Sequence, residues 1–363
     1  MSVTERLDAF QRRHRWASFP LAVIYKFGED QGPYLAALIT YYGFLSMFPL
    51  LLLLASTLGF VLQGSPDLQQ HILDSTLSQF PVIGEQLHQP QGLRGSVGAI
   101  VIGGLVAIYG ALGVAQAVQN AMNVAWSVPR NRRPNPIRAR LRSLHLIGVA
   151  GIAVVLTTVL SALGGSAGDF GVDVGILGNV VAIAISMAVN ASVFILAFRI
   201  TAPPRVHKRD LLPGAILAAV IWQLLQLFGA AYVGNVVKDA GATYGAFALV
   251  LGLFAWIFLA SVGIVLGGEI NVVRAKRLYP RALMTPFTDN VDLTVADRRA
   301  YSDAAQSQQF KGFESVTVSY ENDGQHATAR RRARARATSE GEGGGGGAAD
   351  DDDDGDDDSG STP

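Results

Sequence analysis

The chain has 363 residues, of which 50% are hydrophobic and only 16% are charged, a composition that favours an integral membrane protein over a soluble one. The absence of cysteine excludes disulfide bonds and thiolate metal sites. The net charge of zero hides an asymmetry, because residues 1–281 carry 21 Lys and Arg against 12 Asp and Glu, whereas residues 282–363 carry 8 against 17.

Residues 1–33 are predicted to form a cytoplasmic, basic, amphipathic segment. Aromatic and aliphatic side chains alternate there with five Lys and Arg, which suits a short helix at the inner membrane surface. A solvated arm is the alternative interpretation. No small-residue cleavage site follows the first apolar run, so the pattern does not indicate a cleaved signal peptide.

Six apolar stretches are long enough to cross a hydrocarbon core of about 30 Å as helices. They cover approximately residues 34–62, 96–118, 144–164, 176–198, 211–234 and 245–268. The segments on one side of these spans carry 19 Lys and Arg, whereas those on the other side carry 2, Arg94 and Lys238. The positive-inside rule therefore predicts an all-α membrane domain over residues 34–281, with both termini in the cytoplasm.

Residues 282–363 are predicted to be a disordered cytoplasmic tail. No apolar periodicity continues beyond Met284, and the tail contains an Arg-rich run at 330–337 and eight aspartates within 350–358. Such a composition cannot bury enough apolar surface to fold. A flexible, charge-balanced tail is the favoured interpretation, and contact of its arginines with anionic lipid or RNA is the alternative.

Polar side chains within the predicted spans need a hydrogen-bond partner or a cavity, because hydrocarbon provides neither. One interpretation is hydrogen bonding between packed helices. The other is a polar passage, with a proline that kinks or breaks the first span. The candidate residues are Tyr41, Tyr42, Pro49, Tyr109, Asn190, Gln223, Gln226, Glu269 and Asn271.

Glu269 is the acidic residue at the inner end of the last span. Pairing with Arg274 at the membrane surface would make it an anchor, whereas a dry cavity would allow it to take up a proton. A stripe of amides also occupies one helical face at the inner end of the second span. Its members are Gln116, Gln119, Asn120 and Asn123.

Motifs for catalysis and cofactor binding are missing from the sequence. The six histidines are scattered without metal-ligand spacing, and no phosphate-binding or dinucleotide fingerprint is present. We therefore expect a protein that is not an enzyme, with no catalytic residues, no metal and no cofactor. Membrane lipids are the expected partners, a homo-oligomer is an open alternative, and no specific nucleic acid and no particular substrate is indicated.

Four segments carry a resemblance to a known family. The segments are PYLAALITYYGFLSMFPLLLLL (33–54), AMNVAWSVPRNRRP (121–134), RDLLPGAILAAVIWQLLQLFGAAYV (209–233) and ATYGAFALVLGLFAWIFLASVGIVLGGEIN (242–271). With them the chain resembles the YihY/BrkB membrane proteins, and most closely their YhjD-like branch with actinobacterial members.

The resemblance implies a six-helix, multi-pass protein of the bacterial inner (plasma) membrane. It further implies a transporter-like or lipid- and envelope-precursor-handling function, because the family is linked to envelope phenotypes and this branch to export of lipid A precursors. A non-catalytic envelope scaffold that recruits partners through the tail is the alternative. The label ribonuclease BN attached to the family finds no support, because the cytoplasmic segments offer neither a metal cluster nor an acid/base pair.

Overall fold

The computed structural model describes residues 3–61, 97–169, 175–203, 206–232, 242–289 and 291–320. Regular structure in these residues is helical throughout, which confirms the predicted all-α fold for this part of the chain. The chain divides into two compact units, Met1–Thr317 and Val318–Pro363, and the helices lie in the first. They are α1 (Val3–Arg13), α2 (Arg15–Glu29), α3 (Gly32–Val61), α5 (Val97–Ala125), the 3-10 helix η2 (Arg130–Arg132), α6 (Pro136–Asp169), α7 (Gly175–Thr201), α8 (Lys208–Tyr232), α9 (Ala242–Lys276) and α10 (Val295–Gln306).

Six helices, α3 and α5 to α9, have between 25 and 35 residues. Even the shortest is about 37 Å long at 1.5 Å per residue, which exceeds the thickness of the hydrocarbon core. Among the described residues, four segments are long and apolar enough to cross a membrane. They lie in α5, α7, α8 and α9 and cover Gly103–Ala125, Ala184–Thr201, Lys208–Gly229 and Val250–Lys276.

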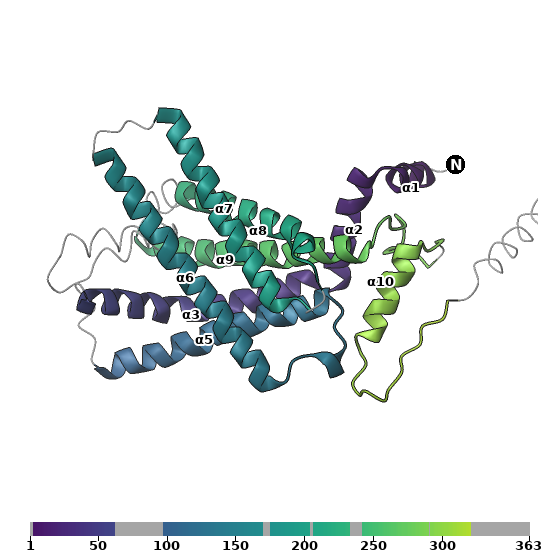
Figure 1. Cartoon of the computed structure of the whole chain (residues 1–363), viewed down its shortest axis with the longest axis horizontal. Coiled ribbons are helices and arrows are strands. Elements are labelled where there is room, and N and C mark those ends of the chain that lie inside the picture. Colours follow the sequence, from purple (N-terminus) through teal and green to yellow (C-terminus); the bar gives the residue numbers. More distant parts are fainter. Residues whose placement is uncertain are drawn as a thin grey trace, which may run out of the picture. The chain divides into compact units, whose positions relative to one another are not determined.

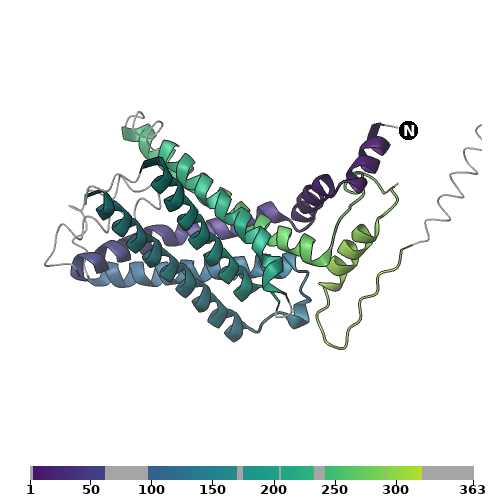
Figure 2. The same ribbon diagram turned by 45° about the horizontal axis from the view of Figure 1, so that its top comes forward.

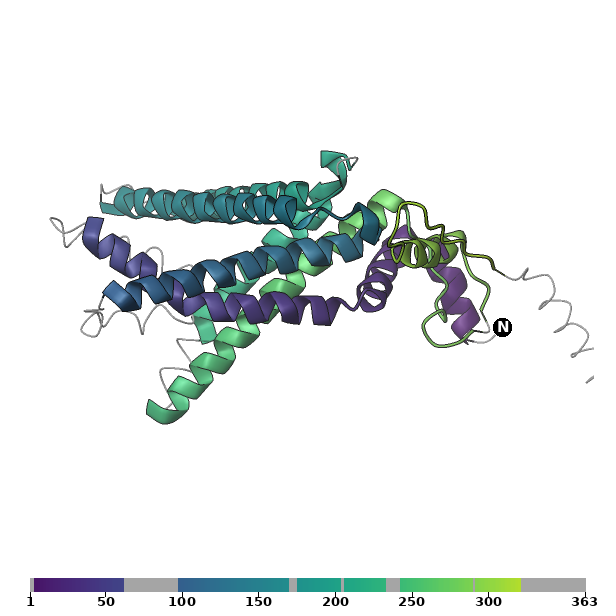
Figure 3. The ribbon, with the colours of Figure 1, turned by 90° about the horizontal axis from the view of Figure 1, so that it is seen from below.

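The long helices pack in a connected series. α3 contacts α5 and α9, and α9 also contacts α8. α6 contacts α5, α7 contacts α8, and α6 and α7 contact each other. Figures 1 and 3 show α6 and α7 as a pair that crosses over the layer containing α3 and α5. α9 is therefore the helix that joins the α3–α5 pair to α8.

Small residues allow the closest of these contacts. A Cβ atom on Gly214 of α8 would lie 1.9 Å from the carbonyl oxygen of Gly267 on α9, and one on Gly110 of α5 would lie 2.4 Å from the Cβ of Ser46 on α3. Membrane helices often associate through such residues, since small side chains let two backbones approach each other.

Pro49 lies inside α3, and the helix continues through it to Val61. Of the two predicted effects of Pro49, a kink or a break, the break does not occur. Figure 3 shows that α3 bends along its length instead, as a helix does when a proline removes one hydrogen bond and clashes with the preceding turn.

The buried core is formed mainly by small and β-branched side chains where α2, α3, α5, α8 and α9 meet. It includes Ala36, Ala121, Leu211, Val265 and Val272, each at most 1% exposed. Large apolar side chains remain on the outer faces of the long helices, for example Leu105, Ile152 and Leu227. This inverted distribution is what a lipid-facing surface requires.

The N-terminal segment is more deeply built into the protein than a helix lying at the surface would be. Two helices replace the single predicted one, with His14 between them, and α2 buries Ser18, Ala22, Val23 and Lys26. Figures 1 and 2 show α1, α2 and α10 together at one end of the long helices.

The expectation that folded structure ends near Met284 is wrong. α10 begins with a capping box in which Thr294 and Asp297 exchange side-chain to backbone hydrogen bonds. Asp297 is fully buried and pairs with the equally buried Arg281. This short polar helix therefore has a tertiary ion pair in addition to the burial of Ala296 and Ala300. The rest of the predicted tail, residues 321–363, lies outside the described residues.

Candidate functional site

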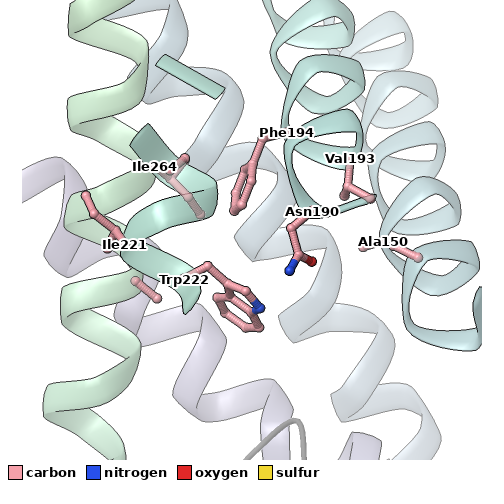
Figure 4. Close-up of a pocket in the computed structure, with 10 residues that line it drawn as sticks. Ala150, Asn190, Val193, Phe194, Ile221, Trp222 and Ile264 are labelled. Carbon is pink, nitrogen blue, oxygen red and sulfur yellow. The ribbon is translucent and has the colours of Figure 1, made fainter. Parts of the chain in front are cut away.

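A pocket of about 210 Å³ opens between the α6–α7 pair and the α8–α9 pair. Nearly all of its lining is apolar, and every contributing helix is one of the long ones. Figure 4 shows the pocket, which is lined by Ala150, Ala153, Asn190, Val193, Phe194, Ala218, Ile221, Trp222, Ala260 and Ile264.

Asn190 is the one amide among the lining residues, and α7 presents it to the pocket. Figure 4 shows its side chain and the indole ring of Trp222 facing the same space from opposite helices. Trp222 packs edge to face on Trp256, with ring centroids 5.2 Å apart, and Trp256 donates a hydrogen bond to the carbonyl oxygen of Leu225 at 3.0 Å. The pocket wall formed by α8 and α9 is therefore held by a specific aromatic contact.

The two predicted glutamines of α8 do not line this pocket. Gln223 and Gln226 are both half-buried, and the side-chain carbonyl oxygen of Gln223 is buried without a hydrogen-bond partner. Gln223 directly follows the pocket residue Trp222, so the two side chains leave α8 in different directions.

The predicted tyrosines gather in one place, but that place is away from the pocket. The rings of Tyr41 and Tyr42 are 5.2 Å apart, and Tyr109 of α5 lies 6.4 Å from Tyr42. Tyr41 and Tyr109 are 59% and 63% exposed, so they form part of the outer surface. Among the residues that the structure describes, the tyrosines and Asn190 therefore do not line one common passage.

Glu269 of α9 is fully buried at the junction with α2. Its nearest cation is Lys26, whose Nζ lies 3.7 Å from Oε2, whereas Arg274 is exposed. Lys26 also pairs with Asp30 and donates a hydrogen bond to the carbonyl oxygen of Ala125 at 3.2 Å. The structure thus gathers one ammonium and two carboxyl groups from α2, the α2–α3 connection and α9 into one buried cluster, called here the Lys26 cluster.

Electrostatics favour a charged lysine in the Lys26 cluster. Burial alone would lower the pKa of Lys26, but the charges of Glu269 and Asp30 outweigh it, and the pKa is raised. Burial raises the pKa of Asp30 despite the attraction of Lys26. At Asp30 the free-energy cost of removing the carboxylate from water therefore exceeds the stabilisation from its attraction to Lys26.

Asn271 lies two residues beyond Glu269 and is 1% exposed. Its side-chain oxygen accepts a hydrogen bond from the backbone N–H of Gly214 at 2.9 Å, which joins α9 to α8. This hydrogen bond is consistent with helix packing, the first of the two interpretations considered above, while the side-chain nitrogen of Asn271 is buried without a hydrogen-bond partner.

The predicted amide stripe divides between buried and exposed positions. Gln119 is buried and donates a hydrogen bond to Ser143 of α6 at 2.9 Å, whereas Gln116 is exposed. Asn120 is half-buried and accepts a long hydrogen bond from Arg133 at 3.5 Å, and Asn123 is half-buried near the end of α5. The stripe thus connects α5 to α6 and to the basic loop between these two helices.

A second charged network closes the end of the protein that carries α1 and α10. The buried guanidinium of Arg281 donates hydrogen bonds to Glu29 at 2.6 and 3.2 Å and pairs with Asp297. Asp8 of α1 accepts a hydrogen bond from the backbone N–H of Leu283 at 2.8 Å. The N-terminal helices and the segment after α9 are therefore bound to each other.

Sequence reasoning did not identify Lys26, Asp30 or Trp222 as site residues. Lys26 and Asp30 are spaced i, i+4 with opposite charges just before the first long helix, and this pattern was a readable signal. No sequence motif marked Trp222. Within the described ranges, no group of three His, Asp or Glu is placed to hold a metal ion.

Comparison with known proteins gives one family match and several distant relatives. A profile of the family described as "Virulence factor BrkB" matches residues 23–290. The chain is 26% identical over 271 residues to the "Putative ribonuclease-like protein YfkH" of Bacillus subtilis (strain 168), covering 72% of this chain and 96% of that protein. No solved structure matches the chain significantly.

Two further relatives are named as membrane proteins. The chain is 26% identical over 254 residues to the "Inner membrane protein YhjD" of Escherichia coli (strain K12), covering 64% of this chain and 74% of that protein. It is 27% identical over 300 residues to a "UPF0761 membrane protein" of Psychrobacter sp. (strain PRwf-1), covering 78% of this chain and 54% of that protein. The chain thus spans about half the length of the last relative.

Proposed function

Because the chain belongs to the virulence factor BrkB family, we propose that this multi-pass inner membrane protein binds and moves a lipid or a lipid-linked precursor of the cell envelope. The pocket between the α6–α7 and α8–α9 pairs carries the proposal. An apolar lining with a single amide suits an amphipathic molecule whose chain enters the pocket while one polar group meets Asn190.

The proposed topology has six spans, formed by α3 and α5 to α9, with both termini in the cytoplasm. The six long helices and the Lys and Arg distribution support it. The chain has no cysteine, so single introduced cysteines report accessibility without background. Arg132→Cys in intact cells should resist an impermeant maleimide that labels Asp173→Cys, and equal labelling of both would reject the topology.

Lipid movement tests the function directly. Purified full-length protein in vesicles should speed the transfer of a fluorescent phospholipid between leaflets. Ala260→Phe fills the pocket and Asn190→Leu removes its amide at similar volume, so both should slow this transfer. Ala184→Phe places the same bulk on an exposed position of α7 and serves as the matched control. Equal transfer by all four proteins, or by vesicles without protein, would overturn the proposal.

An envelope scaffold is the second candidate, and exposed aromatic side chains after α9 favour it. Phe287, Phe310 and Phe313 are 75%, 59% and 92% exposed. Exposed apolar side chains mark a partner-binding surface where they form one contiguous patch. If the protein is a scaffold, a variant that combines Phe313→Ser with truncation after Tyr320 should abolish an envelope phenotype without changing lipid transfer. Truncation after Met284 is a poorer test because it removes Asp297 from its buried pair with Arg281.

We also propose that the protein is not a ribonuclease. The name of one relative contains the term "ribonuclease-like", which is a reason to test for ribonuclease activity. Incubation of the purified protein with labelled RNA should leave the RNA intact. RNA cleavage that persists through purification and disappears with one substitution in the membrane domain would contradict this.

A further inference from the structure

The Lys26 cluster holds an unequal number of charges in a buried place. Lys26 and Glu269 are 3% and 0% exposed, and the side chain of Asp30 is 11% exposed. With every group ionised, one positive charge faces two negative ones. Glu29 adds a further negative charge from α2, but it is bound to Arg281. A buried net negative charge is costly, and the simplest way to remove it is to add one proton.

The hydrogen bonds of the cluster point to where that proton goes. Lys26 contacts Asp30 and the carbonyl oxygen of Ala125, and its 3.7 Å separation from Glu269 is too long for a hydrogen bond. Both carboxyl oxygens of Glu269 are buried and receive no hydrogen bond. Asp30 and Glu269 both lie within ion-pairing distance of the same Nζ atom of Lys26, so their carboxyl groups are neighbours. Two neighbouring buried carboxylates repel each other, and one proton held by the pair removes this repulsion.

We propose that Glu269 and Asp30 share one bound proton, with Lys26 as the fixed counter-ion, and that this is the site at which protons act on the protein. Binding transfers a proton from a hydronium ion to a carboxylate oxygen, forming one O–H bond and leaving water. Release returns the proton to water and restores the net negative charge. No other reactant is needed.

The position of the cluster suggests what proton binding controls. Glu269 lies on α9, five residues after the pocket residue Ile264, or about 7.5 Å along the helix. Protonation changes the attraction between α9 and Lys26 of α2, so it biases the position of a pocket wall. This coupling rests on the proposed lipid-handling function, whereas the proton site itself does not.

Infrared spectroscopy of the full-length protein in lipid tests the proton site without any transport assay. At neutral pH the wild type should show the C=O stretch of one buried, protonated carboxyl group. Glu269→Gln and Asp30→Asn should each abolish this band, because each leaves a single carboxylate facing a single ammonium. Asp303→Asn is the matched control: Asp303 pairs with Lys276 at the surface, and the band should persist. Absence of the band from wild type, or its persistence in either cluster variant, would overturn the proposal.

A further variant keeps this test informative if one of the cluster variants misfolds. Lys26→Met removes the counter-ion and leaves two carboxyl groups, so the protonated band should remain, and circular dichroism would verify the helical fold of each protein. A proton gradient across the vesicles should alter lipid transfer by wild type but not by Glu269→Gln. The expected infrared result without any lipid transfer would reject the proposed function and leave the proton site intact.

Discussion

The side-chain oxygen of Asn271 accepts a hydrogen bond from the backbone N–H of Gly214 at 2.9 Å, at the place where α8 and α9 are in closest contact. A Cβ atom on Gly214 would lie 1.9 Å from the carbonyl oxygen of Gly267 and 2.6 Å from the Asn271 amide. The two helices can therefore form this hydrogen bond only because position 214 has no side chain.

Gly214→Ala should lower the stability of the helix bundle by about 1–3 kcal/mol, since the added methyl group forces α8 away from α9. Thermal unfolding of the purified protein in detergent measures this. Gly148→Ala on α6 is the control, because nothing lies within 4 Å of a Cβ at that position. Equal melting temperatures for the two variants would show that the α8–α9 contact tolerates the extra bulk.

Arg281→Met should destabilise the protein by about 3–5 kcal/mol, because it leaves the buried carboxylate of Asp297 without its charged partner. Limited proteolysis should then cut the chain between α9 and α10 faster than in wild type. Arg12→Met is the comparison, since Arg12 pairs with Asp8 while 34% exposed and should cost about 1 kcal/mol or less. A small effect at both arginines would mean that Arg281 does not hold α10 in place.

Stability should depend on pH through Asp30, which lies outside the long helices. Burial raises the pKa of Asp30 in the folded state. At a pH between the unfolded-state and folded-state pKa values, the folded state therefore keeps a proton that the unfolded state has released. The folded state then binds more protons, and stability falls as pH rises above 3.8, the ordinary pKa of aspartic acid. Asp30→Asn should flatten this decline in melting temperature, whereas Asp303→Asn should keep it. An identical pH dependence in wild type and Asp30→Asn would refute the assignment.

Ser143→Ala should weaken the contact between α5 and α6 by about 0.6 kcal/mol, the average for hydrogen bonds between membrane helices, and by no more than about 1.7 kcal/mol, the largest such value. The change removes the 2.9 Å hydrogen bond from Gln119 but leaves its bonds to the carbonyl oxygens of Ala139 and Ala115. Unfolding by a denaturing detergent gives the difference. Ser192→Ala is the control, as Ser192 is exposed and bonds only within α7.

The sequence was sufficient to predict the long helices. Apolar runs without charge predict membrane helices directly, and α5, α7, α8 and α9 correspond to four of the six predicted spans. Glu269 was also singled out at the inner end of the last span, and the structure buries it fully. What the sequence indicated poorly was its partner, because Arg274 is close in the chain whereas Lys26 is close only in the folded protein.

Tertiary contacts account for the other differences. α10 is a short polar helix whose local mark in the sequence was the Thr294–Asp297 capping signature, and its ion pair with Arg281 forms only in the folded protein. The three tyrosines were expected near a polar passage, but helix rotation decides which face a residue occupies, and Tyr41 and Tyr109 face outward. Periodicity in an almost uniformly apolar helix does not define that rotation.

The contacts of Glu29 and Asp8 with residues 281 and 283 have a consequence for biosynthesis. A ribosome makes α1 and α2 first, yet their partners emerge only after every long helix has been synthesised. Until then Glu29 lacks its partner Arg281, whereas Asp8 has its pairing with Arg12 of the same helix. Completion of the last helices therefore acts as the signal that lets the beginning of the chain dock, so a prematurely terminated chain would present an undocked N-terminus that cellular proteases can recognise.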